Sequence, residues 1–194
     1  MRRAAWLIAG NVLVLAVGVS PAAAEPAPPR VPYVAKGVCP FEGCQYGTWI
    51  AKSRLKAYKS EGDTSMVAFA IAPDERFQAI RGNVHVVKRG EVRVRRPVEV
   101  DPGRVLRRGD RLYVLSYRGE GRYELWHRGA LFTTEAFWPP FVSMERPAGE
   151  ITAWPEMLWW VLVNAGPGRQ GWLRLRNVSR SGFEFNEPLC PGPC

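Results

Sequence analysis

The sequence has 194 residues, and its 27 basic and 18 acidic residues give a formal net charge of +9. This length suffices for one medium domain or two small ones. The basic residues are scattered and no nucleic-acid-binding motif is present, so nucleic acid is excluded as a partner. The charge is compatible with an anionic glycan or a membrane surface, but a solvated surface explains it better.

The N-terminus has the parts of a secretory signal peptide. Arg2 and Arg3 form a positive region, an apolar stretch covers residues 4–19, and the alanines at 22–24 have the small-residue pattern of a cleavage site. The stretch is short for a membrane span of about 20 residues, so we expect cleavage after Ala24 rather than a retained anchor. We therefore expect a secreted or periplasmic protein with no integral membrane segment in its mature chain.

Four cysteines form two close pairs, Cys39 with Cys44 and Cys190 with Cys194. In an oxidising compartment this even number predicts two disulfides, with three possible connectivities. Bridges within each pair would close very short loops, whereas bridges from end to end would close a loop of about 150 residues and contribute about 4–5 kcal/mol in the chain-entropy model. The spacings differ from those of common zinc sites, so no metal is expected.

The first half of the mature chain predicts short strands. Residues 25–36 form a proline-rich linker with little reason to pack. Apolar or alternating runs follow, and they lie at 55–58, 66–72, 76–80, 84–87 and 92–94, with turn residues at 60–63, 73–74, 81–83 and 88–91. The last of these turns predicts a hairpin. Residues 47–57 are compatible with a short helix. The strands predict a small β-unit over residues 37–98, which ends near Pro97.

The second half repeats this pattern. Strands are predicted at 111–117, 122–126 and 130–132, and an irregular insertion rich in Trp and Pro follows over 133–157. Residues 158–163 and 170–175 flank a Gly-rich turn and predict a strong hairpin. We expect a second unit over residues 99–185 and a Cys-Pro-Gly tail over residues 186–194.

The predicted hairpin carries a recognisable pattern. Trp160-Val-Leu-Val163, a Gly-rich turn and then Gly171-Trp172-Leu173 resemble the closing hairpin of bacterial SH3-like (SH3b) domains. Over residues 37–176 the chain resembles exported bacterial SH3-domain-containing proteins. The resemblance implies an all-β fold of two small SH3-like barrels in tandem, with the insertion in the second. It also implies a non-catalytic domain at the cell envelope; some SH3b domains bind peptidoglycan peptides.

Catalytic residues are not recognisable in the sequence. His85 and His127 match no Ser or Cys in a known nucleophile motif. Glu42 and Glu61 have no partner that resembles a glycosidase pair, and no Gly-rich phosphate loop lies between a strand and a helix. We therefore predict that the protein is not an enzyme and needs no cofactor.

The strand predicted at 111–117 is apolar on both faces. Tyr113, Leu115 and Tyr117 share one face, and Leu112 and Val114 share the other. Either both faces are buried between the two units, or one of them forms a groove for a peptide or a glycan.

The candidate binding site lies on the turns of the second unit. Its floor consists of aromatic rings, which are Tyr117, Tyr123 and one of Trp159 or Trp160, because neighbours on a strand face opposite sides. Its rim consists of arginines, which are Arg118, Arg122 and Arg169. They would attract a carboxylate-bearing ligand such as a cell-wall stem peptide. The predicted partner is cell-wall peptide or another exported protein. The alternative is a structural or accessory subunit of an envelope complex without a small ligand.

Overall fold

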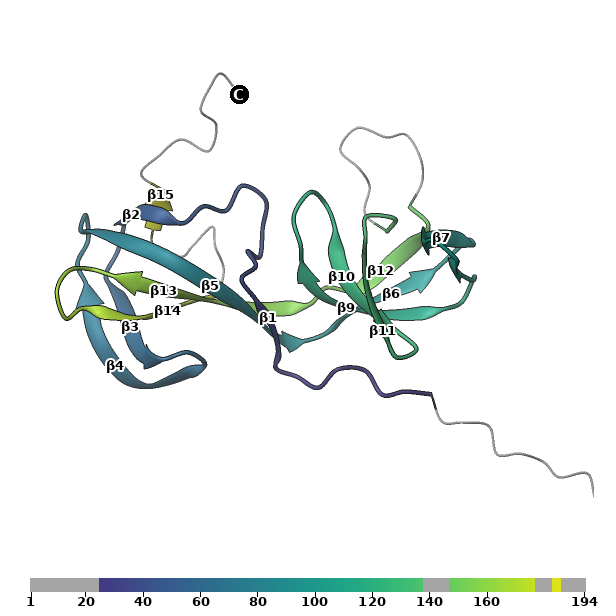
Figure 1. Ribbon diagram of the computed structural model, residues 1–194, viewed down its shortest axis with the longest axis horizontal. Helices are drawn as coiled ribbons and strands as arrows, with labels where there is room; N and C mark the ends of the chain where they lie inside the picture. Colours follow the sequence, from purple (N-terminus) through teal and green to yellow (C-terminus); the bar gives the residue numbers. More distant parts are fainter. Residues whose placement is uncertain (1–24, 138–146, 177–182, 186–194) are drawn as a thin grey trace, which may run out of the picture.

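The computed structural model describes residues 25–137, 147–176 and 183–185. In these ranges the chain forms strands and no helix, which confirms the predicted all-β class. Two larger sheets and one two-stranded sheet are present, and none of them closes into a barrel (Figure 1). No helix in the described ranges is long and apolar enough to cross a membrane.

The first sheet has eight strands. Seven of them lie in the order β15 (Phe183–Phe185), β2 (Gly47–Ala51), β5 (Arg76–Lys88), β13 (Glu156–Asn164), β14 (Gln170–Leu175), β3 (Leu55–Ser60) and β4 (Asp63–Ile71). The eighth, β1 (Tyr33–Lys36), also pairs with β5. Along β5 every second residue near each end is buried, including Phe77 and Val84, because alternate side chains of a strand share one face. Trp49 and Trp159 fill the centre of this core.

The second sheet has five antiparallel strands. They lie in the order β11 (Ala130–Thr134), β10 (Tyr123–His127), β9 (Arg111–Tyr117), β6 (Gly90–Val94) and β12 (Gly149–Ala153). A two-stranded hairpin of β7 (Val98–Asp101) and β8 (Arg104–Leu106) extends the connection from β6 to β9. The core on one face of the five-stranded sheet includes Leu112, Val114, Leu125 and Phe132.

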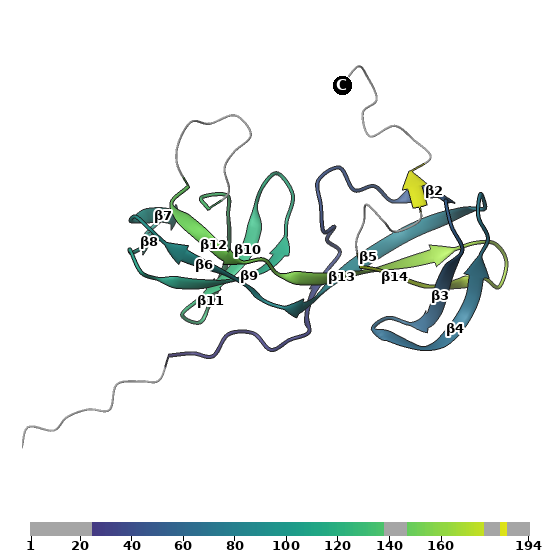
Figure 2. The ribbon, with the colours of Figure 1, turned by 180° about the vertical axis from the view of Figure 1, so that it is seen from behind.

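The second sheet is inserted between two paired strands of the first. β5 and β13 are hydrogen-bonded neighbours, and the residues between them, 89–155, build the second sheet. Lys88, where the chain leaves, is paired with Glu156, where it returns. The two connections therefore run side by side, and the molecule has two lobes (Figures 1 and 2). We call strands β1–β5 and β13–β15 the first lobe and strands β6–β12 the second lobe.

This arrangement corrects the predicted boundary near residue 98. The hairpin at 158–163 and 170–175 was expected in the second unit, but it is β13–β14 of the first lobe, because β13 pairs with β5 along its whole length. The hairpin predicted around 88–91 is also wrong. β5 and β6 follow one another in the sequence, yet they lie in different sheets.

Three further predictions were wrong for local reasons. Residues 81–83 are not a turn but the middle of β5, where a Cβ on Gly82 would lie only 2.5 Å from Trp159 Nε1. A glycine inside a strand often marks such a close approach rather than a turn. The region 47–57 forms β2 and part of β3 rather than a helix. Residues 149–153 of the expected irregular insertion form β12, which pairs with β6.

A disulfide joins Cys39 and Cys44. The first of the two close pairs is therefore bridged locally, and the end-to-end connectivity is excluded. The predicted partners Cys190 and Cys194 lie outside the described residues.

Candidate functional site

A cleft of about 270 Å³ lies between the disulfide loop of the first lobe and the β9–β10 turn of the second. Its walls come from residues 37–44 and 117–119. Gly37, Gly43 and Gly119 have φ values of 65°, 70° and 86°, a backbone region that glycine enters without a steric penalty. The loops therefore turn sharply around the cleft, and two segments about 75 residues apart in the sequence form one concave surface.

A carboxylate fastens the two walls together. Glu42 of the disulfide loop accepts a hydrogen bond from the Tyr117 hydroxyl and one of 3.0 Å from the backbone N–H of Glu120. The Tyr117 oxygen in turn accepts a hydrogen bond of 3.1 Å from the N–H of Gly121. Tyr117 is only 6% exposed, so its role is to hold the turn against the loop. The predicted floor requires an exposed ring for stacking, and the ring of Tyr117 is not exposed.

A second, buried carboxylate lies beside this contact. Glu124 is 8% exposed and accepts hydrogen bonds from Tyr33 (3.0 Å) and Ser116 (3.2 Å). It also forms an ion pair with Arg118. These donors compensate the cost of burying the charge. Burial and then the negative charge of Glu124 raise the pKa of Tyr33, so this hydroxyl keeps its proton and donates it.

An aromatic row leads from the cleft to the surface. The rings of Tyr117 and Tyr123 are 5.1 Å apart, and those of Tyr123 and Trp154 are 6.3 Å apart. Trp154 is 57% exposed, whereas Tyr123 is half-buried. Burial raises the pKa of Tyr123, which keeps the ring neutral at physiological pH. The row offers flat apolar surface next to the charged cleft.

The structure brings together four of the seven predicted binding residues. Tyr117 and Arg118 line the cleft, and Arg122 and Tyr123 follow on the same turn. Arg122 is exposed and pairs with Glu120 at 3.1 Å.

Three members of the site are not predicted from the sequence, and they are Glu42, Tyr33 and Trp154. The first two come from segments remote in the sequence, and no local pattern connects them to the turn. Trp154 was assigned to the irregular insertion. Its position beside Pro155, inside the insertion and four residues before the strand predicted at 158–163, gives no signal of this role.

Neither of the adjacent tryptophans is exposed, whereas the sequence predicts that one of them is either exposed or covered by the insertion at 133–157. Trp159 and Trp160 are 1% and 2% exposed. Trp159 packs on Trp49, with ring centroids 5.4 Å apart. Trp160 faces the other side of β13, where Tyr58 and His85 lie at 6.0 Å. β13 is a central strand covered on both faces, so alternation leaves neither ring to solvent.

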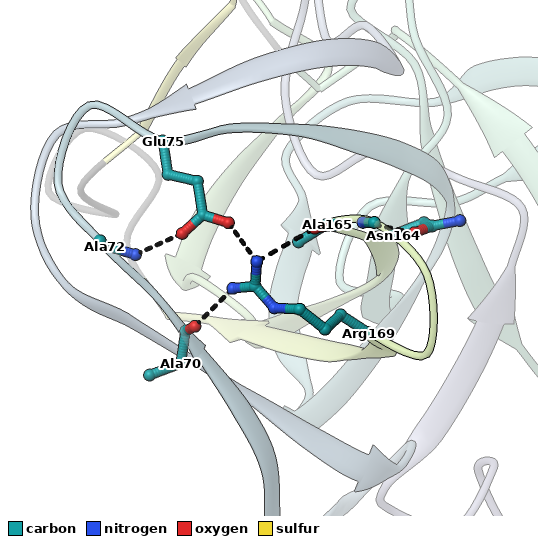
Figure 3. Close-up of polar contacts among 7 residues, drawn as sticks. Ala70, Ala72, Glu75, Asn164, Ala165 and Arg169 are labelled. Carbon is teal, nitrogen blue, oxygen red and sulfur yellow. Dashed lines mark hydrogen bonds and ion pairs between the residues drawn. The ribbon is translucent and has the colours of Figure 1, made fainter.

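Arg169 is not part of the cleft but clamps the β13–β14 turn (Figure 3). Its guanidinium donates hydrogen bonds to Glu75 (2.6 Å), to the Ala70 carbonyl (2.8 Å) and to the Ala165 carbonyl (3.1 Å). It also lies over the Phe69 ring at 5.1 Å. The hydrogen bond from Arg169, together with one from a backbone N–H, lowers the pKa of the Glu75 carboxyl. Arg169 is therefore not part of the predicted rim of the binding site, and its role is to hold the β13–β14 turn.

Two charged side chains line the cleft. It offers one carboxylate and one guanidinium, and both are already engaged in hydrogen bonds or ion pairs. Among the described residues no group of three or more His, Cys, Asp or Glu side chains is placed to hold a metal ion. No protein family model, curated protein or solved structure matches the chain. The function is therefore inferred from the geometry of the cleft and its surroundings.

Proposed function

We propose that this protein is an exported, non-catalytic SH3-like binding module that recognises cell-wall peptide or another envelope protein. The observation that carries the proposal is the cleft between the disulfide loop and the β9–β10 turn, where Glu42 and Arg118 lie beside an aromatic row. Loops held on a rigid sheet are the usual place for recognition in small β-folds.

The strand order of the second lobe supports the SH3-like part of this proposal. β6, β9, β10 and β11 follow one another as a meander, and the fifth strand, β12, returns beside the first. SH3-like barrels use the same order. The first lobe departs from this order because β13 and β14 enter between β5 and β3. The sequence motif that carries the resemblance, β13–β14, lies in the first lobe, so the motif and the strand order support the proposal from different lobes.

The size and charge of the cleft favour the end of a peptide. Its volume of about 270 Å³ is below the range of about 300–1,000 Å³ that is usual for small-molecule sites, so it suits a terminal residue rather than a whole glycan strand. Arg118 attracts a carboxylate and Glu42 attracts an amine. A cell-wall stem peptide carries both groups, and the exposed Trp154 offers surface to its apolar parts.

The test is binding of the full chain to purified cell wall and to a soluble stem peptide, measured by co-sedimentation and calorimetry. Arg118→Gln should weaken binding about tenfold, which is about 1.4 kcal/mol. Arg108→Gln is the matched control, because Arg108 is exposed and does not line the cleft. Thermal unfolding is measured in parallel, since Arg118 also compensates Glu124. If the protein without substitutions binds neither the cell wall nor the stem peptide, the proposal is contradicted.

One observation favours the alternative of an accessory subunit without a small ligand. Tyr117, Trp159 and Trp160 are all buried, so most of the predicted aromatic floor contributes to the protein's own packing. On this alternative the exposed Trp154 at the end of the aromatic row is a contact for a fixed protein partner. A photo-cross-linking residue at position 154 would then recover one exported protein in stoichiometric amount from the native compartment. The protein would not bind cell wall.

A further inference from the structure

The outer face of the second sheet carries apolar residues that belong to neither core. Leu115 and Trp126 are 0% and 7% exposed, yet they are not among the residues that pack in the core of the sheet. Trp126 is the register partner of Tyr113, and their rings are 5.9 Å apart. This face is the second apolar face that the sequence predicts for residues 111–117. We call Tyr113, Leu115 and Trp126 the outer aromatic face.

Residues 25–32 run along this face, although the sequence predicts an unpacked linker there. Glu25 lies 3.5 Å from Arg128, and the Pro26 ring packs on Gly129, where an added Cβ would lie 3.1 Å from Pro26 Cγ. Further along, Tyr33 donates to Glu124. The contacts thus begin at the turn between β10 and β11 and end near the start of β10. The segment passes beside the second lobe in both views (Figures 1 and 2).

Arg89 connects the segment to the aromatic face. Its guanidinium donates a hydrogen bond of 2.6 Å to the Pro29 carbonyl and lies over the Tyr113 ring at 5.0 Å. Arg111 lies over the same ring, also at 5.0 Å. Pro28 and Pro29 are half-buried, whereas Glu25, Pro26 and Ala27 are exposed. The segment belongs to no strand, so the ion pair of Glu25, the packing of Pro26 and the hydrogen bond to the Pro29 carbonyl hold it instead of sheet pairing.

We propose that the outer aromatic face is a binding surface for an extended proline-rich peptide, and that residues 25–32 of this chain are its intramolecular occupant. Proline-rich segments lose little entropy on binding, and they dock on aromatic surfaces through flat rings and exposed carbonyls. Arg128 favours a peptide with an acidic residue before its first proline. Arg89 donates a hydrogen bond to the carbonyl of the residue three positions after that proline. The surface takes such a segment from a partner when residues 25–32 leave it. This site is separate from the cleft of the proposed function.

The test releases the segment in the full chain and supplies it again as a separate peptide. Pro26→Gly, Pro28→Gly and Pro29→Gly are combined, because these positions precede the first strand and leave both sheets unchanged. The probe is a synthetic peptide with the sequence of residues 25–32. We expect this variant to bind the peptide at least tenfold more tightly than the unmodified chain, whose surface is occupied. The NMR signals of Trp126 and Gly129 should shift during the titration.

Two variants locate the binding. In the released chain Arg89→Ala should weaken peptide binding at least fivefold, whereas Arg76→Ala, at an exposed arginine at the start of β5 in the first lobe, should leave it unchanged. Equal effects of the two substitutions would overturn the proposal, as would a folded released chain that binds the peptide no better than the unmodified one.

If the released chain fails to fold, the unmodified chain still decides the question. The heteronuclear NOE values of residues 25, 27, 30 and 31 should be those of ordered backbone. Random-coil values would overturn the proposal.

Discussion

Gly82 lies where β5 passes closest to the aromatic core. An added Cβ would lie 2.5 Å from Trp159 Nε1, 2.9 Å from the Trp160 carbonyl and 2.9 Å from the Tyr46 hydroxyl. The carbonyl belongs to the paired strand and has no room to retreat. A residue that looks like a turn signal in the sequence is therefore needed for packing at the centre of the first lobe.

Gly82→Ala should destabilise the protein by about 3 kcal/mol, the upper end of the cost of overpacking a core. Urea unfolding measures this loss. Gly103→Ala is the control, since Gly103 faces open space and its φ of 78° predicts a backbone penalty of only about 1 kcal/mol. Equal losses for the two variants would mean that Gly82 has no steric role.

Arg169 illustrates why the candidate site was only partly predictable. The turn at residues 164–169 is evident in the sequence, but the residues that bind its guanidinium are Glu75 and Ala70, more than 90 residues earlier. No local pattern identifies such partners. Tyr117 and Arg118 both line the cleft, because they are adjacent in the sequence at the end of β9.

Arg169→Ala should lower the free energy of unfolding by about 1–2 kcal/mol, because it removes charge-assisted hydrogen bonds that are partly exposed. It should leave cell-wall binding unchanged. Arg76→Ala, at an exposed arginine next to Glu75, should change stability by less than about 0.5 kcal/mol. If Arg169→Ala loses cell-wall binding without any loss of stability, Arg169 belongs to the binding site after all.

His127 gives the stability a defined pH dependence. Its burial lowers the pKa of the imidazole, and the negative charge of Asp110 opposes this only in part. The folded state therefore binds the proton less readily than the unfolded chain, whose His pKa is about 6.5. The stability contributed by neutral His127 is present above this value and is lost as the pH falls below it. The Tm should drop between pH 7.5 and pH 5, and less so in His127→Gln. A pH-independent Tm in this range would contradict the assignment.

At the scale of the elements, most strands could be predicted from the sequence and their partners could not. The runs at 66–72, 111–117, 158–163 and 170–175 correspond closely to β4, β9, β13 and β14. Alternation and turn residues are local signals, so they identify these segments. Pairing is a long-range property. The preference for neighbouring strands predicts a hairpin of β5 with β6, whereas β5 pairs with β13 across an insertion that no local signal marks.

The β3–β4 hairpin covers the outer side of β13 and is fastened at its tip. Glu61 lies 2.6 Å from His85 Nε2 and accepts a hydrogen bond of 2.8 Å from Asn83. Both partners are on β5, and Trp160 lies beneath the hairpin against Tyr58. The position of the hairpin over this tryptophan thus depends on one carboxylate.

Glu61→Ala should cost about 1–3 kcal/mol, because it leaves two half-buried polar groups without their acceptor. Hydrogen exchange should accelerate in β4 and leave β9 and β10 unaffected. Glu156→Ala is the matched control, since Glu156 forms an exposed ion pair with Lys88 and its loss should cost less than about 1 kcal/mol. Unchanged exchange in β4 would show that apolar packing alone holds the hairpin.

At the scale of the whole molecule, the two lobes are joined by more than their paired connections. Glu42 of the first lobe meets Tyr117 of the second, and Tyr33 meets Glu124. The first contact joins two residues that line the cleft, so the cleft exists only when the lobes are held together. The inserted architecture therefore links the fold to the proposed function: the first lobe supplies the disulfide loop, and the second supplies the turn with Arg118.

The most direct test of the proposed function is an NMR titration of the full chain with a soluble cell-wall stem peptide, read at each assigned backbone amide. We expect saturable shifts that concentrate in residues 37–44 and 117–123, together with a shift of the Trp154 indole signal. The outer aromatic face should remain unaffected. Shifts centred anywhere else, or no shifts at millimolar peptide, would contradict the assignment of the cleft as the binding site.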